Sequence, residues 1–313
     1  PMFLLGQRIG NYEIQKSIGR GTFGAVYLVR DVFLEQLRAI KVPHDQSPAG
    51  REAILRESRL LAALEHPNIV RLLACNEDDD TLFVVMEWVE GQSLARRLDE
   101  EAPLPAAAST RIVRQVLSGL AHAHDRKLLH GDISADNILL SGDAAKITDF
   151  GMARTVHVAE HGARRIGNPY YLAPEQFRAE AVFASDVYAV GVVLYQMLTG
   201  SLPYQDPDPE RQRILVEAGG NEHPGRHNPS VSGDLDAVVA KALAPRVSNR
   251  YATADSMLSD LRELASFGPP PEERQAVIDR IQEAERPPRN CWSCGRRLHP
   301  EATRCAHCGA SLR

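Results

Sequence analysis

Three polar side chains in the middle of the chain have the types and the spacing that phosphoryl transfer requires. Asp132, in His130-Gly-Asp-Ile-Ser-Ala-Asp-Asn137, can accept the proton of an attacking hydroxyl, and Asn137 on the same predicted loop can reach a metal ion. Asp149, in Thr148-Asp-Phe-Gly151, supplies a second oxygen ligand for Mg²⁺ between phosphates. The transition state is mostly charge to be neutralised and atoms to be aligned, which is why the reaction needs this set.

A glycine-rich segment, Gly19-Arg-Gly-Thr-Phe-Gly-Ala-Val26, lies between two predicted strands. Glycine lets such a hairpin approach phosphate oxygens closely, and its backbone N–H groups can donate hydrogen bonds to them. Taken alone, the pattern is also compatible with a plain hairpin. Because it stands between two strands, and not between a strand and a helix, it argues against a dinucleotide-binding fingerprint and favours a flap over ATP.

A lysine and a glutamate follow at spacings that support the same chemistry. Lys41 ends the apolar strand segment Ala39-Ile-Lys41, where a lone lysine is ordinarily just a solvated end. The next segment, Arg51–Leu64, has helical periodicity and offers Glu57. We expect Glu57 to hold the Lys41 ammonium against the α- and β-phosphates of a nucleotide.

In this order the motifs resemble those of the eukaryotic-type (Hanks-type) bacterial serine/threonine protein kinases. The resemblance covers Tyr12–Leu264, most of the chain. Four more segments match the family in order: His66-Pro-Asn-Ile-Val70, Val85-Met-Glu-Trp-Val-Glu-Gly91, Ala173-Pro-Glu175 and Asp186-Val-Tyr-Ala-Val-Gly191.

The resemblance implies a two-lobed α+β fold and transfer of the γ-phosphoryl group of ATP to serine or threonine hydroxyls of proteins. It implies that Asp132 orients the hydroxyl, that Asn137 and Asp149 hold Mg²⁺ or Mn²⁺, and that Lys41 and Glu57 position the phosphates. Met86 is the implied gatekeeper, and the Glu87 carbonyl and Val89 amide are expected to hold adenine. The implied ATP-binding residues are Ile18, Gly19, Gly21, Gly24, Val26, Ala39, Lys41, Met86, Glu87, Val89 and Leu139.

Two structural pairs are implied as well. Glu175 is expected to pair with Arg250, and Asp186 is expected to anchor the backbone of the catalytic loop. Both residues stand at positions that the family uses for these contacts.

Three positions depart from the family pattern. Gly131 replaces an arginine that reads a phosphate on the activation segment, and in the stretch 152–166 Thr155 is the only hydroxyl residue. We therefore expect activity without activation-loop phosphorylation. Ser134 replaces the lysine that normally contacts the γ-phosphate. Asn168 replaces a threonine whose side chain normally contacts the base, here Asp132. These two changes put the catalytic rate and the serine/threonine selectivity in question more than ATP binding.

Two other functions compete with a protein kinase. Kinases of small molecules such as aminoglycosides or choline also have His-Gly-Asp in the catalytic loop, but they do not need the complete glycine loop or Ala173-Pro-Glu175. A pseudokinase, acting as an ATP-responsive scaffold, is favoured by Ser134 and Asn168 and opposed by the intact metal ligands.

The elements that must position these residues change in character along the chain. A β-rich front is followed, after Gly91, by a mainly helical back, which predicts an α+β arrangement in two lobes. The expected organisation is an N-terminal extension 1–11, a kinase domain 12–265 with lobes 12–89 and 92–265, a proline-rich charged linker 266–290 and a zinc ribbon 291–313.

The zinc ribbon is predicted from two cysteine pairs, Cys291-Trp-Ser-Cys294 and Cys305-Ala-His-Cys308, each followed by glycine. Such pairs direct four thiolates at one ion, and four ligands close the site, so the predicted Zn²⁺ is structural. Metal binding of roughly 10–16 kcal/mol would supply most of the folding free energy of so small a segment. We expect it to be a docking site for a protein partner.

Composition and charge limit the class of protein and the partners that can be expected. The 313 residues are 43% apolar and 25% charged, which is ordinary for a globular protein. A formal net charge of −5 gives no general reason to expect nucleic-acid binding. The sequence has no apolar stretch of the ~20 residues that a membrane helix needs, and the N-terminus lacks the basic start of a signal peptide. Cysteines grouped as metal ligands favour a reducing compartment, the cytoplasm.

Overall fold

The computed structural model describes residues 3–21, 24–150, 154–155, 167–266, 292–295 and 304–311. The chain divides into two compact units, unit 1 (Pro1–Leu264) and unit 2 (Ala265–Arg313). Among the described residues, no helix combines the length and the apolar character needed to cross a membrane.

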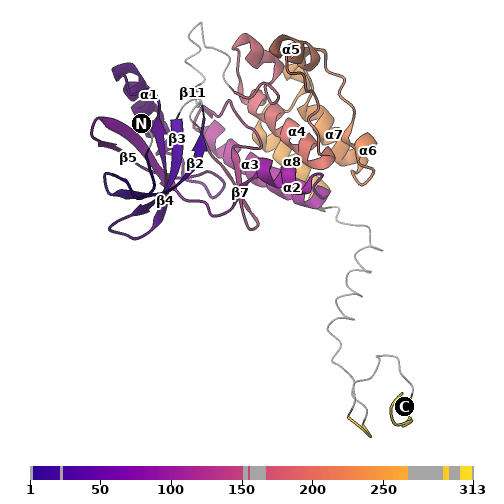
Figure 1. Cartoon of the computed structure of the whole chain (residues 1–313). Helices are drawn as coiled ribbons and strands as arrows, with labels where there is room; N and C mark the ends of the chain where they lie inside the picture. Colours follow the sequence, from indigo (N-terminus) through magenta and orange to yellow (C-terminus); the bar gives the residue numbers. More distant parts are fainter. Residues whose placement is uncertain are drawn as a thin grey trace. The chain divides into compact units, whose positions relative to one another are not determined.

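The first part of unit 1 is a six-stranded antiparallel sheet in the order β1-β2-β3-β4-β6-β5 (Figure 1). Its strands are β1 (Arg8–Ile9), β2 (Tyr12–Arg20), β3 (Gly24–Asp31), β4 (Leu37–Pro43), β5 (Leu72–Asp78) and β6 (Thr81–Glu87). Alternate residues of β3 are buried, including Tyr27 and Val29, and they join Ile40 and Val85 in the core of this lobe. The period of two is what lets one face of a strand pack while the other faces the cleft.

The register of the sheet places the predicted nucleotide residues side by side. Val26 lies opposite Lys41, and Ala39 lies opposite Met86. Because cross-strand partners point to the same face of a sheet, residues from β3, β4 and β6 form one surface. Helix α1 (Pro48–Leu61) is tied to β5 by an ion pair between Arg51 and Glu77, with nitrogen and oxygen 2.6 Å apart.

The second part of unit 1 is mainly helical. Its helices are α2 (Leu94–Glu101), α3 (Ala106–Asp125), α4 (Phe183–Thr199), α5 (Pro209–Ala218), α6 (Pro224–His227), α7 (Gly233–Ala242) and α8 (Ala254–Ser266), with 3₁₀ turns η1 (Pro174–Arg178) and η2 (Val247–Asn249). Two small sheets accompany these helices, in the orders β10-β9-β7 and β11-β8; their strands are β7 (Gln92–Ser93), β8 (Leu128–Leu129), β9 (Ile138–Ser141), β10 (Ala144–Ile147) and β11 (Arg154–Thr155). Most of α4 is buried, as its continuous apolar sequence requires.

The predicted two-lobed α+β architecture is confirmed. Some boundaries differ from those predicted. The sheet begins at β1, within the segment expected to be an extension. Helix α1 begins three residues earlier than predicted, because Ser47 caps it by accepting a hydrogen bond from the Gly50 N–H (3.2 Å) and proline occupies its first turn.

The described residues of unit 2 form two turns. The N–H of Gly309 donates to the Cys305 carbonyl at 2.9 Å, and the indole N–H of Trp292 donates to the Ser311 carbonyl at 3.0 Å. Gly295 and Gly309 have φ of 71° and 75°, a left-handed conformation that glycine adopts without penalty. This explains why a glycine follows each cysteine pair.

Candidate active site

A cavity of about 660 Å³ lies between the sheet and the helical lobe. All the residues that the sequence predicted for ATP binding line it: Ile18, Gly19, Gly21, Gly24, Val26, Ala39, Lys41, Met86, Glu87, Val89 and Leu139. Asn137 and Asp149 line it as well, on the side of the helical lobe. The structure therefore brings together, in one cavity, residues from the glycine loop, from the hinge segment Val85–Gly91 and from the predicted metal site.

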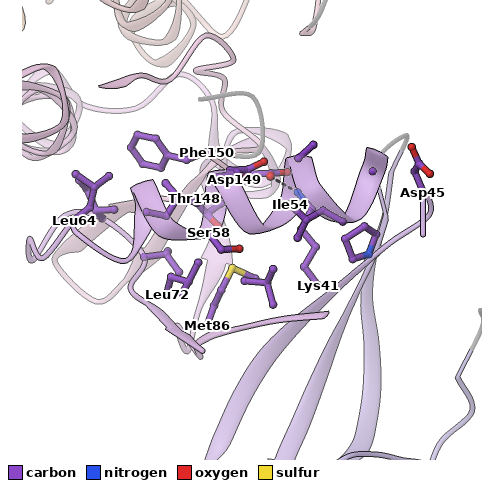
Figure 2. Close-up of a pocket in the computed structure, with 18 residues that line it drawn as sticks. Lys41, Asp45, Ile54, Ser58, Leu64, Leu72, Met86, Thr148, Asp149 and Phe150 are labelled. Atoms are coloured by element: carbon purple, nitrogen blue, oxygen red, sulfur yellow. Dashed lines mark hydrogen bonds and ion pairs between the residues drawn. The ribbon is translucent and has the colours of Figure 1, made fainter. Parts of the chain in front are cut away.

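Lys41 is paired with Asp149 in this structure. Its Nζ donates to an Asp149 carboxylate oxygen in a short contact, drawn as a dashed line beneath α1 in Figure 2. Among the described residues, no hydrogen bond or ion pair joins Lys41 to Glu57. The expected Lys41–Glu57 pair is thus not formed, because Asp149 takes the ammonium that Glu57 was predicted to hold.

Glu57 instead lies largely in apolar surroundings on α1. Burial raises the pKa of its carboxyl to about 7; the positive charge of Lys41 partly opposes this shift and the negative charge of Asp149 adds to it. An ammonium within bonding distance would have held the pKa low. The raised pKa of Glu57 therefore reflects a buried carboxyl group that forms no ion pair with Lys41.

A second cavity, of about 220 Å³, lies behind the first and beneath α1. Figure 2 shows its wall, with Ile54 and Ser58 from α1, Leu72 and Met86 from the sheet, and Phe150 from the segment after β10. Its apolar residues are Ala53, Ile54, Leu61, Leu64, Ile69, Val70, Leu72, Val84, Met86 and Phe150. Met86 lines both cavities and so stands between them.

Asp132 is held from two directions, by its own loop and by the loop that contains Asn168. The side-chain amide of Asn137 donates to the Asp132 carbonyl at 2.8 Å and to its carboxylate oxygen Oδ2 at 3.2 Å. The other carboxylate oxygen, Oδ1, accepts from the backbone N–H of Asn168 at 3.2 Å. Burial raises the pKa of Asp132, and the Asn168 amide is the largest influence in the opposite direction. A raised pKa suits a group that must take up a proton near neutral pH.

Asp149 occupies an uncommon backbone conformation, with φ of 61°. A left-handed residue other than glycine at a cleft is strained, and such strain concentrates at functional sites. The side chain after it, Phe150, packs on the ring of His130 with centroids 4.5 Å apart. His130 Nε2 lies 3.1 Å from the Thr148 carbonyl, so the loop and the Asp149 segment support each other.

The two predicted structural pairs are confirmed. Asp186, buried on α4, accepts hydrogen bonds from the backbone N–H groups of His130 (2.9 Å) and Gly131 (2.8 Å). Arg250 donates to both carboxylate oxygens of Glu175, at 2.8 and 3.1 Å, in a buried bidentate pair. Burial is the largest single influence on the pKa of Glu175 and would raise it, but the hydrogen bonds and the charge of Arg250, together with the Ser185 hydroxyl, hold that pKa below its usual value.

The three departures from the family pattern have distinct surroundings. Gly131 has φ of 79°, so a glycine is favoured there on backbone grounds alone. Ser134 is buried in the loop, and Asn168 contacts Asp132 through its backbone. Thr155 belongs to β11, which pairs with β8; the surrounding stretches 151–153 and 156–166 lie outside the described residues.

Sequence reasoning missed two supports of the site. His124 Nε2 lies 2.8 Å from Asp186 Oδ2, and Lys146 Nζ donates to Glu87 Oε1 at 2.7 Å beneath the hinge. The position of each residue in its helix or strand could have been recognised from the sequence. His124 continues the apolar stripe of α3, and Lys146 lies between the buried strand residues Ala145 and Ile147, which puts it on the opposite face.

Comparison with known proteins decides the family. Residues 12–261 match the family model described as the protein kinase domain. The chain belongs to the protein kinase family. This confirms the resemblance drawn from the motifs, and the two lobes are those of the protein kinase fold.

The kinase domain is similar to several bacterial enzymes. It is 35% identical over 267 residues to the serine/threonine-protein kinase PrkC of Bacillus subtilis (strain 168), covering 83% of this chain and 41% of that protein. It is 35% identical over 280 residues to the serine/threonine-protein kinase PknB of Mycobacterium leprae (strain TN), covering 86% and 45%. The chain thus spans less than half the length of these relatives.

The predicted zinc ligands of unit 2 converge in part. The sulfurs of Cys294, Cys305 and Cys308 lie within 4.8 Å of one another, which is compatible with one shared ion. The backbone N–H of His307 donates to the Cys305 sulfur at 3.4 Å, and with the Cys308 amide it lowers the pKa of Cys305 to about 6. Such a thiolate suits Zn²⁺. The fourth predicted ligand, Cys291, lies outside the described residues.

Proposed function

We propose that this chain is an ATP-dependent protein kinase that phosphorylates serine or threonine hydroxyls of proteins. One observation carries the proposal: the cavity that gathers the predicted nucleotide residues also contains Asn137 and Asp149, and Asn137 is hydrogen-bonded to the predicted base Asp132. Nucleotide, metal and hydroxyl acceptor would therefore meet at one point. The named activity of the relatives supports the same class of reaction.

Each residue has a role that follows from its position. The backbone of the glycine loop, Gly19–Gly24, would cover the phosphates, and the Glu87 carbonyl and Val89 amide would hold adenine. Asn137 and Asp149 would hold Mg²⁺ or Mn²⁺, which supplies positive charge to the phosphate oxygens. Asp132 would orient the hydroxyl of the protein substrate and accept its proton.

The proposed reaction requires a change at the base of the cleft. A divalent ion bound to Asp149 would weaken the pairing of Asp149 with Lys41, because the two cations repel each other at one carboxylate. The released ammonium would contact the nucleotide phosphates, and Glu57 on α1, which lines the same cavity and whose pKa Lys41 already lowers, is the carboxylate available to hold it. We infer that nucleotide and metal binding move Lys41 from Asp149 to Glu57.

Activation-loop phosphorylation is not needed in this proposal. Gly131 offers no side chain to read a phosphate, and the backbone of this residue is already held by Asp186. Gln176 also holds it, by donating from Nε2 to the Gly131 carbonyl at 3.0 Å. The loop is thus supported by neutral hydrogen bonds and one buried carboxylate.

The decisive experiment is transfer from γ-labelled ATP with Mg²⁺ to a panel of proteins, an aminoglycoside and choline. We expect label on protein serine or threonine, and a loss of about 100-fold or more in Asp132→Asn and Lys41→Met. The matched control Asp234→Asn changes an exposed carboxylate on α7 and should keep the parent rate. Label on the small molecules alone would identify a small-molecule kinase, and ATP binding without any transfer would identify a pseudokinase.

The same assay tests independence from phosphorylation. Protein treated with phosphatase, and the variant Thr155→Ala, should both retain the parent rate. Loss of transfer after phosphatase treatment would contradict this part of the proposal while leaving the kinase activity itself established.

We further propose that unit 2 holds one structural Zn²⁺ through Cys291, Cys294, Cys305 and Cys308 and serves as a docking site for a protein partner. The convergence of three sulfurs supports the metal. Trp292, with 78% of its surface exposed, supports the docking site, since exposed tryptophans are frequent anchors of interfaces. The grouping of these cysteines as metal ligands supports a reducing compartment such as the cytoplasm.

A further inference from the structure

The loop that follows the activation segment touches the predicted base through its backbone. The Asn168 N–H donates to Asp132 Oδ1, while the Asn168 side chain takes no part in this contact. The family pattern has a threonine here, whose side chain is expected to contact the base. The chain therefore makes this contact with a different chemical group, a main-chain amide.

The Asn168 side chain is used to shape its own loop. Its Oδ1 accepts the backbone N–H of Tyr170 at 3.2 Å, and its carbonyl accepts the backbone N–H of Tyr171 at 3.0 Å. This is an Asx turn combined with a β-turn, with asparagine in the first position and Pro169 in the second. Proline restricts φ, so the turn has few alternative conformations.

The loop also has little space in which to shift. Gly167 has φ of 117°, and a Cβ on it would lie 3.0 Å from Asp132 Oδ1 and 3.1 Å from a Leu172 methyl carbon. The loop backbone thus passes directly over the carboxylate. A change in the turn at Asn168 would change the direction of the one N–H that reaches Asp132 from this side.

We propose that Asn168 is a positioning residue: its side chain closes the turn that aims its own backbone N–H at Asp132. This inference rests on the proposed function, in which Asp132 is the base. In the reaction the amide would keep the carboxylate aligned toward the substrate hydroxyl and stabilise its charged form. It also accounts for the loss of the threonine hydroxyl without loss of a donor to the base.

The test compares Asn168→Ala with Asn168→Asp. Alanine removes the acceptor of the Asx turn, so we expect kcat to fall about tenfold, with KM for ATP within about twofold of the parent, since the nucleotide residues are untouched. Aspartate keeps an acceptor for the Tyr170 N–H but cannot donate a hydrogen bond as threonine does. It should restore kcat at the alkaline plateau to within about threefold of the parent.

Comparison of kcat with KM and with thermal stability separates positioning from simple stability. Loss of a correctly directed amide should lower kcat in Asn168→Ala while KM for ATP and the melting temperature stay close to those of the parent. The matched control is Asn228→Ala, because Asn228 Oδ1 likewise accepts a backbone N–H, that of Ser230 at 3.1 Å, but lies outside the cleft lining. This control should leave kcat unchanged.

A measurement that does not need turnover keeps the inference distinct from the proposed function. The backbone N–H of residue 168 can be followed by hydrogen exchange; it should exchange faster in Asn168→Ala than in the parent or in Asn168→Asp, and at the parent rate in Asn228→Ala. Equal exchange in Asn168→Ala and the parent, or an Asn168→Asp kcat as low as that of Asn168→Ala, would overturn the positioning role. An inactive parent in which this exchange still depends on the Asn168 side chain would instead count against the proposed function alone.

Discussion

At the scale of single residues, Glu57 combines burial with a missing partner. Because its pKa is raised to about 7, the folded protein holds this proton at pH values where the unfolded chain, with a pKa of 4.5, has lost it. Stability should therefore be complete below about pH 4.5 and should fall as the pH rises towards 7. The expected loss is at most about 3 kcal/mol of unfolding free energy.

Urea unfolding at a series of pH values measures this effect. Glu57→Gln cannot ionise, so it should be more stable than the parent at pH 8 and should lack this part of the pH dependence. The matched control is Glu52→Gln on the same helix, since Glu52 is largely exposed. If Glu57→Gln followed the parent curve, the carboxyl would have to be already paired in solution.

Residue types and order were enough to predict which side chains gather at the cleft, but not which of them pair. The partners of Glu175 and Asp186 were predicted correctly because both are held within the helical lobe. The partner of Lys41 was not, since Lys41 belongs to β4, Asp149 to the segment after β10 and Glu57 to α1. The choice between the two carboxylates depends on where α1 lies against the sheet, and no local pattern encodes that.

At the scale of elements, the hinge and β9 approach each other at a single glycine. Gly91 has φ of 152°, and a Cβ on it would lie 1.8 Å from the Leu140 carbonyl oxygen. Gly91→Ala therefore forces β7 and β9 apart, and we expect a loss of about 2 kcal/mol of unfolding free energy. ATP binding should weaken as well, because Leu140 follows the cleft residue Leu139.

The control for this prediction is Gly233→Ala at the start of α7. A Cβ there would meet nothing within 4 Å, and its φ is not left-handed. The same substitution should therefore stabilise the protein by about 0.5 kcal/mol, by reducing the freedom of the unfolded chain. Equal changes in the free energy of unfolding for Gly91→Ala and Gly233→Ala would show that the close approach of Gly91 to Leu140 does not affect stability.

Long elements were predictable and short ones were not. The helical period of the segment Arg51–Leu64 predicted α1, which the structure places at Pro48–Leu61. The strands β7, β8 and β11 contain two residues each, too few to show a period. They form because each has a partner that is distant in the sequence: β7 pairs with β9, and β8 pairs with β11.

At the scale of the whole molecule, the chain consists of two units with different sources of stability. Unit 1 has a large apolar core, whereas the described part of unit 2 buries little besides Cys305. We expect one zinc per chain by elemental analysis, and its loss in Cys294→Ser and Cys305→Ser. Chelation should unfold unit 2 and leave the melting temperature of unit 1 unchanged.

Cys75→Ala is the control for the zinc prediction, because Cys75 lies on β5 in unit 1. It should keep the full zinc content. Zinc retained after substitution of Cys294 and Cys305 together would rule out the proposed ligand set.

The anchoring of the catalytic loop to α4 has a consequence for the order of events in the proposed cycle. Asp132 and Asn137 are built into the rigid helical lobe through Asp186, while the glycine loop and Lys41 belong to the sheet. If the sheet tilted during nucleotide release in the proposed cycle, the contacts that hold Asp132 and Asn137 within the helical lobe would be kept. A protein substrate would then meet Asp132 and Asn137 in the same arrangement at every turnover, whatever the position of the sheet.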